Sequence, residues 1–287
     1  MTKHKVAVPY MGGKFSLLKH ILPQLPESKI FVDVFGGGGS VVYNKRPVSP
    51  ITVYNDLSSE VYVFFKVLRE RYDELHHLLE YTPFSCQLFK EAYAKLRRGK
   101  SEGLSELERA WYWFILIRQS FGKKGDSFAR GLHKPCFRCF PVSVSNLRDL
   151  SDFFKGISID NIDYWNLMQK YDSENTLFYC DPPYLAQCVS KASSEGYFNS
   201  FSLEDHKLFL DRIKTLKGKV CVSHYKVDLY DRELSDWRKV YFERKIMVKK
   251  IKDGSKRPVA TEGIYCNYDL EQNGSKLFHV EQSRLSS

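Results

Sequence analysis

The sequence predicts an α/β protein in which a doubly wound mixed sheet carries an inserted lobe of helices and a hairpin. Three observations lead to this prediction: a strand pattern that runs into a glycine loop, a second strand close behind it, and strand–helix alternation that resumes after residue 146. Residues 82–146, between the two strand-rich parts, have a helical and then a loop-like pattern. We therefore expect a sheet domain over 1–57 and 147–287 and an inserted domain over 58–146.

The first eighty residues alternate between helical and strand patterns. Leucine and isoleucine recur at helical spacing behind Gly13, whereas both strand candidates are short runs of β-branched and aromatic residues. The first strand runs directly into four glycines, Gly36 to Gly39. The predicted elements are, in order, a helix over 17–25, strands over 30–35 and 51–56, and a helix over about 58–80.

The inserted part begins as helix and continues as loop. Ser105 and Glu108 have the spacing of a capping box, and the aromatic run Trp111–Phe114 follows them. Glycines and prolines predict the loop: Gly122, Gly125, Gly131, Pro135 and Pro141. After the insertion we expect strands over 157–160 and 176–180, a helix over about 202–217, a strand over 219–223, and strands near 241–251 and 263–268 around a basic loop.

Composition favours a folded protein with a polyanionic partner. The chain has 287 residues, of which 43% are hydrophobic, and its longest apolar run, Ala110–Ile117, is too short to span a membrane. The net charge of +10 favours nucleic acid, with a membrane surface and plain solubility as alternatives. No secretory signal begins the sequence, and its seven scattered cysteines suit reduced thiols, so we expect a cytoplasmic protein.

The glycine loop predicts an adenosine site at the end of the first strand. Glycines there let the backbone turn sharply and approach a ligand closely, and Asp56 ends the next strand roughly 20 positions after Gly36, where an acid binds ribose hydroxyls. An ordinary strand-to-helix turn is the alternative. A P-loop is not expected, because no Gly-Lys-Ser/Thr sequence follows the glycines.

The tetrapeptide Asp181-Pro182-Pro183-Tyr184 directly follows a strand pattern. Prolines have fixed φ angles and no N–H to donate, so the strand must end there in a rigid turn. This turn lies at the carboxyl end of the strand, the edge at which α/β sheets bind ligands. It therefore presents a carboxylate, a free carbonyl and an aromatic face together.

With these motifs, the sequence resembles the S-adenosylmethionine-dependent DNA N6-adenine methyltransferases, in particular the Dam-like alpha group. The resemblance runs through most of the chain, and it implies a Rossmann-like methyltransferase fold, a bacterial or phage source and a DNA-recognition lobe over 58–146. The matching motifs are Pro9-Tyr-Met-Gly-Gly-Lys14, Phe35-Gly-Gly-Gly-Gly39, Tyr54-Asn-Asp56, Asn161-Ile-Asp163 and Asp181-Pro-Pro-Tyr184.

The resemblance also implies a role for each motif. Asp181 and the Pro182 carbonyl would accept the two amino hydrogens of adenine, and Tyr184 would stack on a base flipped out of the duplex. Asp56 would bind the ribose of S-adenosylmethionine and Asp163 its adenine, with Lys14 placed near a carboxylate. The implied cofactor-binding residues are Tyr10, Gly12, Gly13, Lys14, Asp33, Phe35, Gly36, Gly38, Asp56, Asp163 and Asp181. No metal is expected.

Two short basic segments are the candidate DNA-binding surfaces. Residues 118–138 hold six basic residues and one acid, and residues 237–257 hold nine basic residues and two acids, so together they exceed the net charge of the chain. Such side chains bind phosphates and give DNA binding a strong salt dependence. The candidate DNA contacts are Arg118, Lys123, Lys124, Arg130, Lys134, Lys250, Lys256 and Arg257.

Several alternatives stay open. The family's Arg-Gly-x-Phe-Asn-type recognition hairpin is replaced here by Phe121–Phe128, so the recognition sequence is not predicted. His133, Cys136 and Cys139 offer three zinc ligands where a structural site needs four, and we expect no zinc there. The rival functions are methylation of adenine in RNA or single-stranded DNA, and DNA binding without catalysis. A cognate restriction endonuclease is a further partner that the resemblance suggests.

Overall fold

The computed structural model describes residues 8, 10, 12–97, 101–123, 125–129, 136–185, 201–245 and 259–270. Its strands are β1 (Ile30–Asp33), β2 (Ile51–Asn55), β3 (Ser158–Asp160), β4 (Thr176–Cys180), β5 (Lys219–Tyr225), β6 (Arg238–Lys245) and β7 (Val259–Cys266). Its helices are α1 (Leu18–Ile21), α2 (Ser40–Asn44), α3 (Ser59–Glu70), α4 (Tyr72–Glu80), α5 (Cys86–Arg97), α6 (Glu106–Gln119), α7 (Cys136–Ser145), α8 (Leu147–Lys155), α9 (Tyr164–Tyr171), α11 (Leu203–Ile213) and α12 (Asp228–Glu233). Three 3₁₀ turns cover Lys14–Leu17, Leu22–Gln24 and Phe121–Lys123.

The strands form one seven-stranded sheet in the order β3-β2-β1-β4-β5-β7-β6. Strands β1 to β5 run parallel, and β7 is antiparallel to both β5 and β6. The chain moves outward from β1 to β3 and then returns to pair β4 with the other side of β1. The predicted doubly wound mixed sheet is therefore confirmed, and its switch point lies between β1 and β4.

Each face of the sheet is covered by helices, because the central strands are buried on both sides. Phe31 and Val32 are neighbours on β1, yet they belong to different hydrophobic clusters. One cluster contains residues of α9, α11 and α12, and the other contains residues of α1, α2, α3 and α8. This arrangement explains the nearly continuous apolar pattern of β1 and β4.

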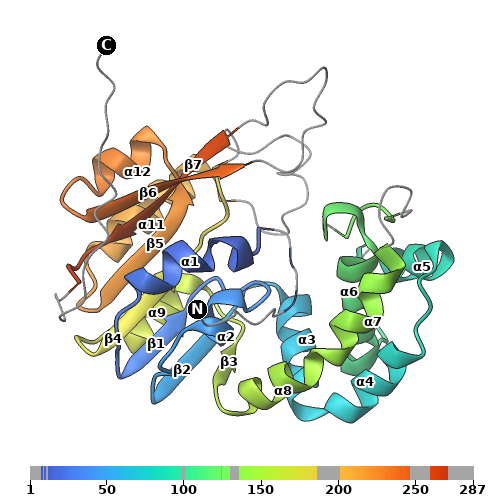
Figure 1. Ribbon diagram of the computed structural model, residues 1–287. Coiled ribbons are helices and arrows are strands. Elements are labelled where there is room, and N and C mark those ends of the chain that lie inside the picture. Colours follow the sequence, from blue (N-terminus) through green and yellow to red (C-terminus); the bar gives the residue numbers. More distant parts are fainter. Residues whose placement is uncertain are drawn as a thin grey trace, which may run out of the picture.

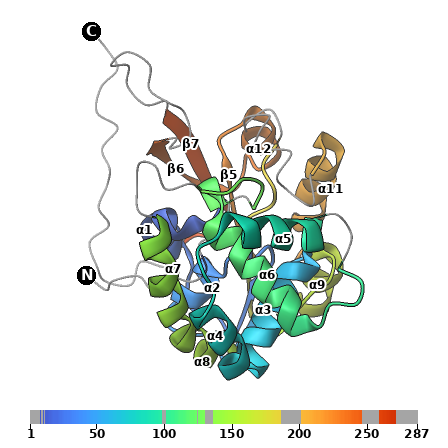
Figure 2. The same cartoon turned by 90° about the vertical axis from the view of Figure 1, so that its right-hand side faces the viewer.

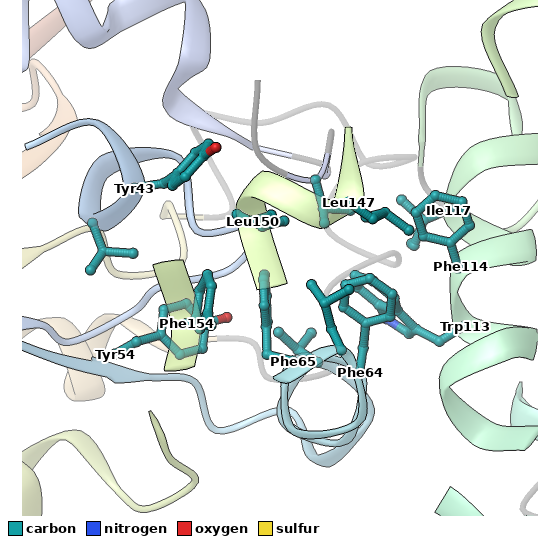
Figure 3. Close-up of a cluster of buried hydrophobic side chains, with 14 of the residues drawn as sticks. Tyr43, Tyr54, Phe64, Phe65, Trp113, Phe114, Ile117, Leu147, Leu150 and Phe154 are labelled. Carbon is teal, nitrogen blue, oxygen red and sulfur yellow. The ribbon is translucent and has the colours of Figure 1, made fainter. Parts of the chain in front are cut away.

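A helical lobe lies to one side of the sheet, where Figure 1 shows α4 to α7 grouped on the right and Figure 2 views them from that side. Aromatic side chains join the lobe to the sheet, as Figure 3 shows. Phe65 of α3 stacks on Phe154 of α8 with ring centroids 4.4 Å apart, and both rings contact Tyr54 of β2. On the other side of α3, Phe64 contacts Trp113 of α6, so one hydrophobic cluster continues from sheet to lobe.

Some helices differ from the sequence prediction. The helix expected over 58–80 is broken at Arg71, whose φ of −134° and ψ of 41° are not helical. The loop expected around Pro141 is wrong: Pro141 lies inside α7, where Phe140 and Val144 are buried. Tertiary burial of an apolar face outweighs the local cost of proline here. No described helix has the length and apolar character that crossing a membrane requires.

Candidate active site

The carboxyl ends of β1, β2 and β4 surround a cavity that encloses about 1080 Å³, part of which is open to solvent. This is the place at which a doubly wound sheet binds ligands. The sequence-predicted catalytic and cofactor-binding residues all line it: Tyr10, Gly12, Gly13, Lys14, Asp33, Phe35, Gly36, Gly38, Asp56, Asp163, Asp181, Pro182 and Tyr184. Motifs far apart in the sequence thus meet at one site, and their individual roles stay predictions.

The glycine loop is shaped by close packing. A Cβ atom on Gly36 would lie 2.1 Å from the Tyr54 ring, and one on Gly38 would lie 2.2 Å from the carbonyl oxygen of Val8. The Tyr54 hydroxyl donates to the carbonyl of Gly37, which has a positive φ of 49°. Gly36 and Gly38 therefore let Tyr54 and the N-terminal segment pack against the loop, which fixes its course along the cavity.

Asp56 is held at the cavity by backbone groups. Its two carboxylate oxygens accept hydrogen bonds from the N–H groups of Gly37 and Ser58, both at 2.8 Å. The neighbouring Asn55 joins the ends of three strands, because its amide donates to the carbonyls of Val34 and Ile162 and accepts from the Ile162 N–H. Each carboxylate oxygen retains a second lone pair, so Asp56 can still accept from a ligand's hydroxyls.

Lys14 and Asp181 form an ion pair at the centre of the site. The Lys14 ammonium lies 2.5 Å from both Asp181 oxygens, and the two side chains are 4% and 17% exposed. The same ammonium lies 4.7 Å from the centre of the Tyr184 ring. The carboxylate that the resemblance placed near Lys14 is thus, in this structure, Asp181 itself.

Burial raises the pKa values of three carboxyl groups in the cavity, including that of Asp56. It raises the pKa of Asp181 to about 6, although the nearby Lys14 ammonium acts to lower it. It raises the pKa of Asp33 to about 8, against a hydrogen bond from the Val42 N–H. The other oxygen of Asp33 has no hydrogen-bond partner among the described residues. Shifted carboxyl groups gathered in one cleft are typical of a functional site.

Asp163 reaches the cavity from the start of α9. It is the N-cap of that helix, and its Oδ1 accepts from the Trp165 N–H at 2.9 Å. Asn161 of the same motif donates to the Asp56 carbonyl at 2.6 Å, which ties the two acidic motifs together. Asp163 is therefore held beside Asp56 at the same edge of the sheet.

Tyr184 is packed by residues that the sequence analysis did not select. Its ring contacts His224 and Tyr225 of β5, with centroids 5.0 and 4.5 Å away, and its hydroxyl donates to Glu262 of β7. Burial lowers the pKa of His224 to about 3, so the neutral ring can accept from the Leu185 N–H through Nε2. Neither strand carries a motif that links it to Tyr184, so the sequence held no signal for these contacts.

The predicted DNA contacts are described only in part. Arg118 is half-buried near the end of α6, and Lys123 is exposed in the turn that follows, stabilised by the Ser120–Phe128 bridge. Neither residue lines the cavity. The remaining candidates lie outside the described residues: Lys124, Arg130, Lys134, Lys250, Lys256 and Arg257.

Part of the C-terminal basic segment is used inside the molecule. Arg238 donates to Gln24 and to the Tyr268 carbonyl, Lys239 donates to the Asp231 carbonyl, and Arg244 pairs with Glu262. These three cations have protein partners. The surplus charge counted for residues 237–257 therefore overstates what is available to DNA.

The described residues contain no group of three or more His, Cys, Asp and Glu side chains that suits a metal ion. His133 and the side chains of Cys136 and Cys139 lie outside them, so the absence of zinc at that motif stays a prediction. The cavity has other lining residues that the sequence analysis did not select, among them Ser40, Asn55, Ser58, Ile162, Tyr164, Tyr179 and Phe201.

Comparison with known proteins identifies a family model and several relatives that match this chain. A model of the D12 class of N6 adenine-specific DNA methyltransferases matches residues 10–252. The DNA adenine methylase of Escherichia coli (strain K12) is 26% identical over 219 residues, which are 71% of this chain and 73% of that protein. The DNA N-6-adenine-methyltransferase of Escherichia phage P1 is 26% identical over 214 residues, which are 69% of this chain and 26% of that protein.

Among solved structures, an rRNA methylase from Streptococcus thermophilus covers 92% of this chain and 98% of its own, with 12% sequence identity. Its TM-score against this chain is 0.31.

Proposed function

The chain belongs to the D12 class of N6 adenine-specific DNA methyltransferases, and from that premise we propose that the cavity beside Asp181 is its active site. DNA is therefore the substrate, adenine N6 is the methylated atom and a methyl donor is required. We infer that the donor is S-adenosylmethionine and that the target DNA is double-stranded. The sole observation that carries this assignment is the meeting of the separate motifs around one cavity.

The residues at the β1 and β2 ends fit S-adenosylmethionine. Asp56 offers acceptors for ribose hydroxyls, Phe35 and Ile162 offer apolar surface for an adenine ring, and Asp163 offers a carboxylate beside them. The buried oxygen of Asp33 that has no hydrogen-bond partner among the described residues would suit a further polar group of the ligand.

Asp181 and Pro182 would activate the adenine amine. The amine is a weak nucleophile because its lone pair is delocalised into the ring. The Asp181 carboxylate and the Pro182 carbonyl accept one amino hydrogen each, which turns the lone pair out of the ring plane and toward the methyl group. When bound, S-adenosylmethionine would supply the methyl group from a positively charged sulfur, which makes a neutral thioether the leaving group. Asp181 then takes the proton that N6 releases.

Lys14 would keep Asp181 ready for this role. A buried carboxylate tends to protonate, and a protonated Asp181 is a poorer acceptor. The Lys14 ammonium, at 2.5 Å from both oxygens, favours the charged form. Each Asp181 oxygen keeps a second lone pair with which it can accept from the adenine amine.

Tyr184 would hold the target base. Its ring lies next to Asp181 and Pro182, on the cavity wall. An adenine paired inside a duplex cannot reach a site at the end of the sheet, so the base must leave the stack at a cost of roughly a few kcal/mol. Stacking on Tyr184 offsets part of that cost.

Recognition of DNA is assigned to the remaining parts of the chain. We propose that residues 58–146 form the target-recognition domain and that 1–57 and 147–287 form the catalytic domain. Arg118, Lys123, Lys124, Arg130 and Lys134 would contact DNA from the first domain and Lys250, Lys256 and Arg257 from the second. The proposal includes a cytoplasmic location.

The test is methylation of DNA in cells. Expression in a host that lacks N6-methyladenine, followed by sequencing that detects the mark, should reveal methylated adenines in one sequence context. Asp181→Ala should abolish methyl transfer while leaving DNA binding within about threefold of wild type, because it removes one acceptor and no phosphate contact. Asp152→Ala, at an exposed carboxylate paired with Lys155, is the control and should methylate normally.

Two outcomes would contradict the proposal. If the wild-type chain methylates RNA and leaves DNA unmarked, the substrate is wrong. If it binds DNA and transfers no methyl group from S-adenosylmethionine to any nucleic acid, the assignment of the cavity as an active site is wrong.

A further inference from the structure

A buried carboxylate lies behind the tyrosine of the Asp-Pro-Pro-Tyr motif. Glu262, in β7, has no exposed surface. The Tyr184 hydroxyl donates to it, 3.0 Å from Oε2 and 3.2 Å from Oε1. Arg244, in β6, donates to Oε1 at 2.9 Å. Among the described residues, Glu262 therefore has two hydrogen-bond partners, of which one is a cation and the other is a cavity residue.

The stability of the sheet does not require a charged side chain at position 262. Glu262 is followed on β7 by Ile264, Tyr265 and Cys266, which are all fully buried, so an apolar side chain would suit the same position. Burying a carboxylate carries a desolvation cost that an ion pair only partly recovers, and replacement of such pairs by apolar residues is often neutral or stabilising. A buried glutamate at this position thus points to a function other than holding the hairpin together.

The Glu262 carboxylate restrains the side chain of Tyr184. Pro182 and Pro183 fix the backbone before Tyr184 but not the torsions of its side chain. His224 and Tyr225 contact the ring, and Lys14 lies over it, whereas the hydroxyl is held by Glu262. A stacking surface acts well only when its plane is fixed before the base arrives.

We propose that Glu262, balanced by Arg244, is a positioning residue that fixes the Tyr184 ring in the orientation required to receive the target adenine. The inference rests on the proposed function, since it gives Tyr184 the role of base platform. The pair also extends the site to β6 and β7, which line no part of the described cavity. By holding the Tyr184 ring, Glu262 would affect the rate of methyl transfer, because a small displacement of the bound adenine lowers that rate by a large factor.

The first test compares single-turnover rates at saturating S-adenosylmethionine on an oligonucleotide that the wild type methylates. Glu262→Leu should lower the rate constant about tenfold or more. Glu262→Gln, which keeps an oxygen for the hydroxyl, should restore the rate to within about threefold of wild type. Tyr184→Phe should behave like Glu262→Leu, and the double variant should be no slower than the slower single variant, because both substitutions remove the same hydrogen bond between the Tyr184 hydroxyl and Glu262. The KM for the methyl donor should not change.

Asp231 provides a matched control, since its Oδ1 also accepts from tyrosine hydroxyls, at 2.6 Å from Tyr241 and 2.8 Å from Tyr265. Asp231→Asn should lower the melting temperature without lowering the rate constant. If Glu262→Leu behaves the same way, with a lower melting temperature and an unchanged rate, Glu262 has a structural role only. Multiplicative losses in the double variant would also overturn the proposal.

A second measurement needs neither DNA nor methyl donor. In protein labelled with 3-fluorotyrosine, the ¹⁹F resonance that disappears in Tyr184→Phe belongs to Tyr184. Glu262→Leu should shift and broaden that resonance, and Asp231→Asn should leave it in place. An unmoved resonance overturns the inference whatever the enzyme does. A shifted resonance in a protein that methylates no DNA would instead refute the proposed function and leave the Glu262 contact standing.

Discussion

At the scale of single residues, the proposed methyl transfer depends on how burial and charge act on Asp181. Removal from water disfavours its ionised form, and the Lys14 ammonium favours it. The outcome is a raised pKa of about 6, which leaves Asp181 ionised at neutral pH and yet basic enough to take a proton from the amine. Asp33, without an ammonium in contact, has a pKa raised further, to about 8.

The pH dependence of methyl transfer should follow from this balance. Since only ionised Asp181 accepts an amino hydrogen, the single-turnover rate should fall as the pH falls through about 6, by about tenfold for each unit below it. Lys14→Met removes the group that lowers the pKa of Asp181, so the acid limb should move to higher pH. Rates measured between pH 5 and 9 check both expectations.

The control for this prediction is Lys155→Met, which removes an equal charge from an exposed pair with Asp152. It should leave the acid limb in place. Identical profiles for Lys14→Met and wild type would mean that Lys14 does not set the ionisation of Asp181.

At the scale of elements, the residue pattern explains only part of the need for glycine in the loop Gly36–Gly39. From the sequence, glycine is expected here because it lets the backbone approach a ligand closely. The structure adds that Gly36 faces the ring of Tyr54, which is itself fully buried and packs against Phe65 and Phe154. The loop is therefore fixed by the same aromatic cluster that joins the sheet to the lobe. Figure 3 shows Tyr54, Phe65 and Phe154 of this cluster.

Gly36→Ala should consequently destabilise the protein. Its Cβ would lie 2.1 Å from a ring that has no room to move, and forced packing of this kind costs about 1–3 kcal/mol. The affinity for S-adenosylmethionine should fall as well, because the loop lines the cavity. Thermal unfolding and isothermal titration measure the two effects.

Gly156→Ala is the matched control. Gly156 has a φ of −90°, and its Cβ would meet only the Phe153 carbonyl oxygen, at an ordinary 3.5 Å. It should unfold at nearly the wild-type temperature. If Gly36→Ala were equally harmless, the Tyr54 ring would have to be more mobile than its burial indicates.

At the scale of the whole molecule, the net charge of +10 is a weaker guide than its distribution. Arg238, Lys239 and Arg244 belong to the basic segment 237–257, but the fold gives each of them an internal partner. DNA binding must then depend on fewer cations than the count suggests. Arg118 belongs to α6 and Lys123 to the turn that follows it, and Figure 1 shows α6 in the helical lobe beside the sheet.

We expect the affinity for DNA to fall steeply with salt, because each phosphate contact releases a counterion. Lys123→Gln should reduce the slope of log affinity against log salt by about one, the value for a single phosphate contact. Lys155→Gln, on α8, should leave the slope unchanged. Fluorescence anisotropy at several salt concentrations measures the slopes, and a flat dependence for the wild type would exclude phosphate binding as the main source of affinity.

The sequence by itself determined the features that depend on neighbours along the chain. The strands β1, β2, β4 and β5 follow from their apolar runs, and the helix start at Ser105 follows from its capping box, in which Ser105 and Glu108 bond reciprocally. The family resemblance of the motifs named residues that line one cavity, while the roles of these residues stay predictions. Pro182 and Pro183 end their strand wherever it packs, since their constraint is covalent.

Only the tertiary structure decided the features that depend on residues far apart in the sequence. Pro141 lies in a helix because burial of that helix outweighs a local penalty. The Lys14–Asp181 pair joins residues 167 positions apart, and the Tyr184–Glu262 contact joins residues 78 apart. Which charges face the ligand, which are used internally and what supports the Tyr184 ring are set by the crossing of strands in the sheet. These pairings depend on through-space distance, and local residue patterns do not encode it.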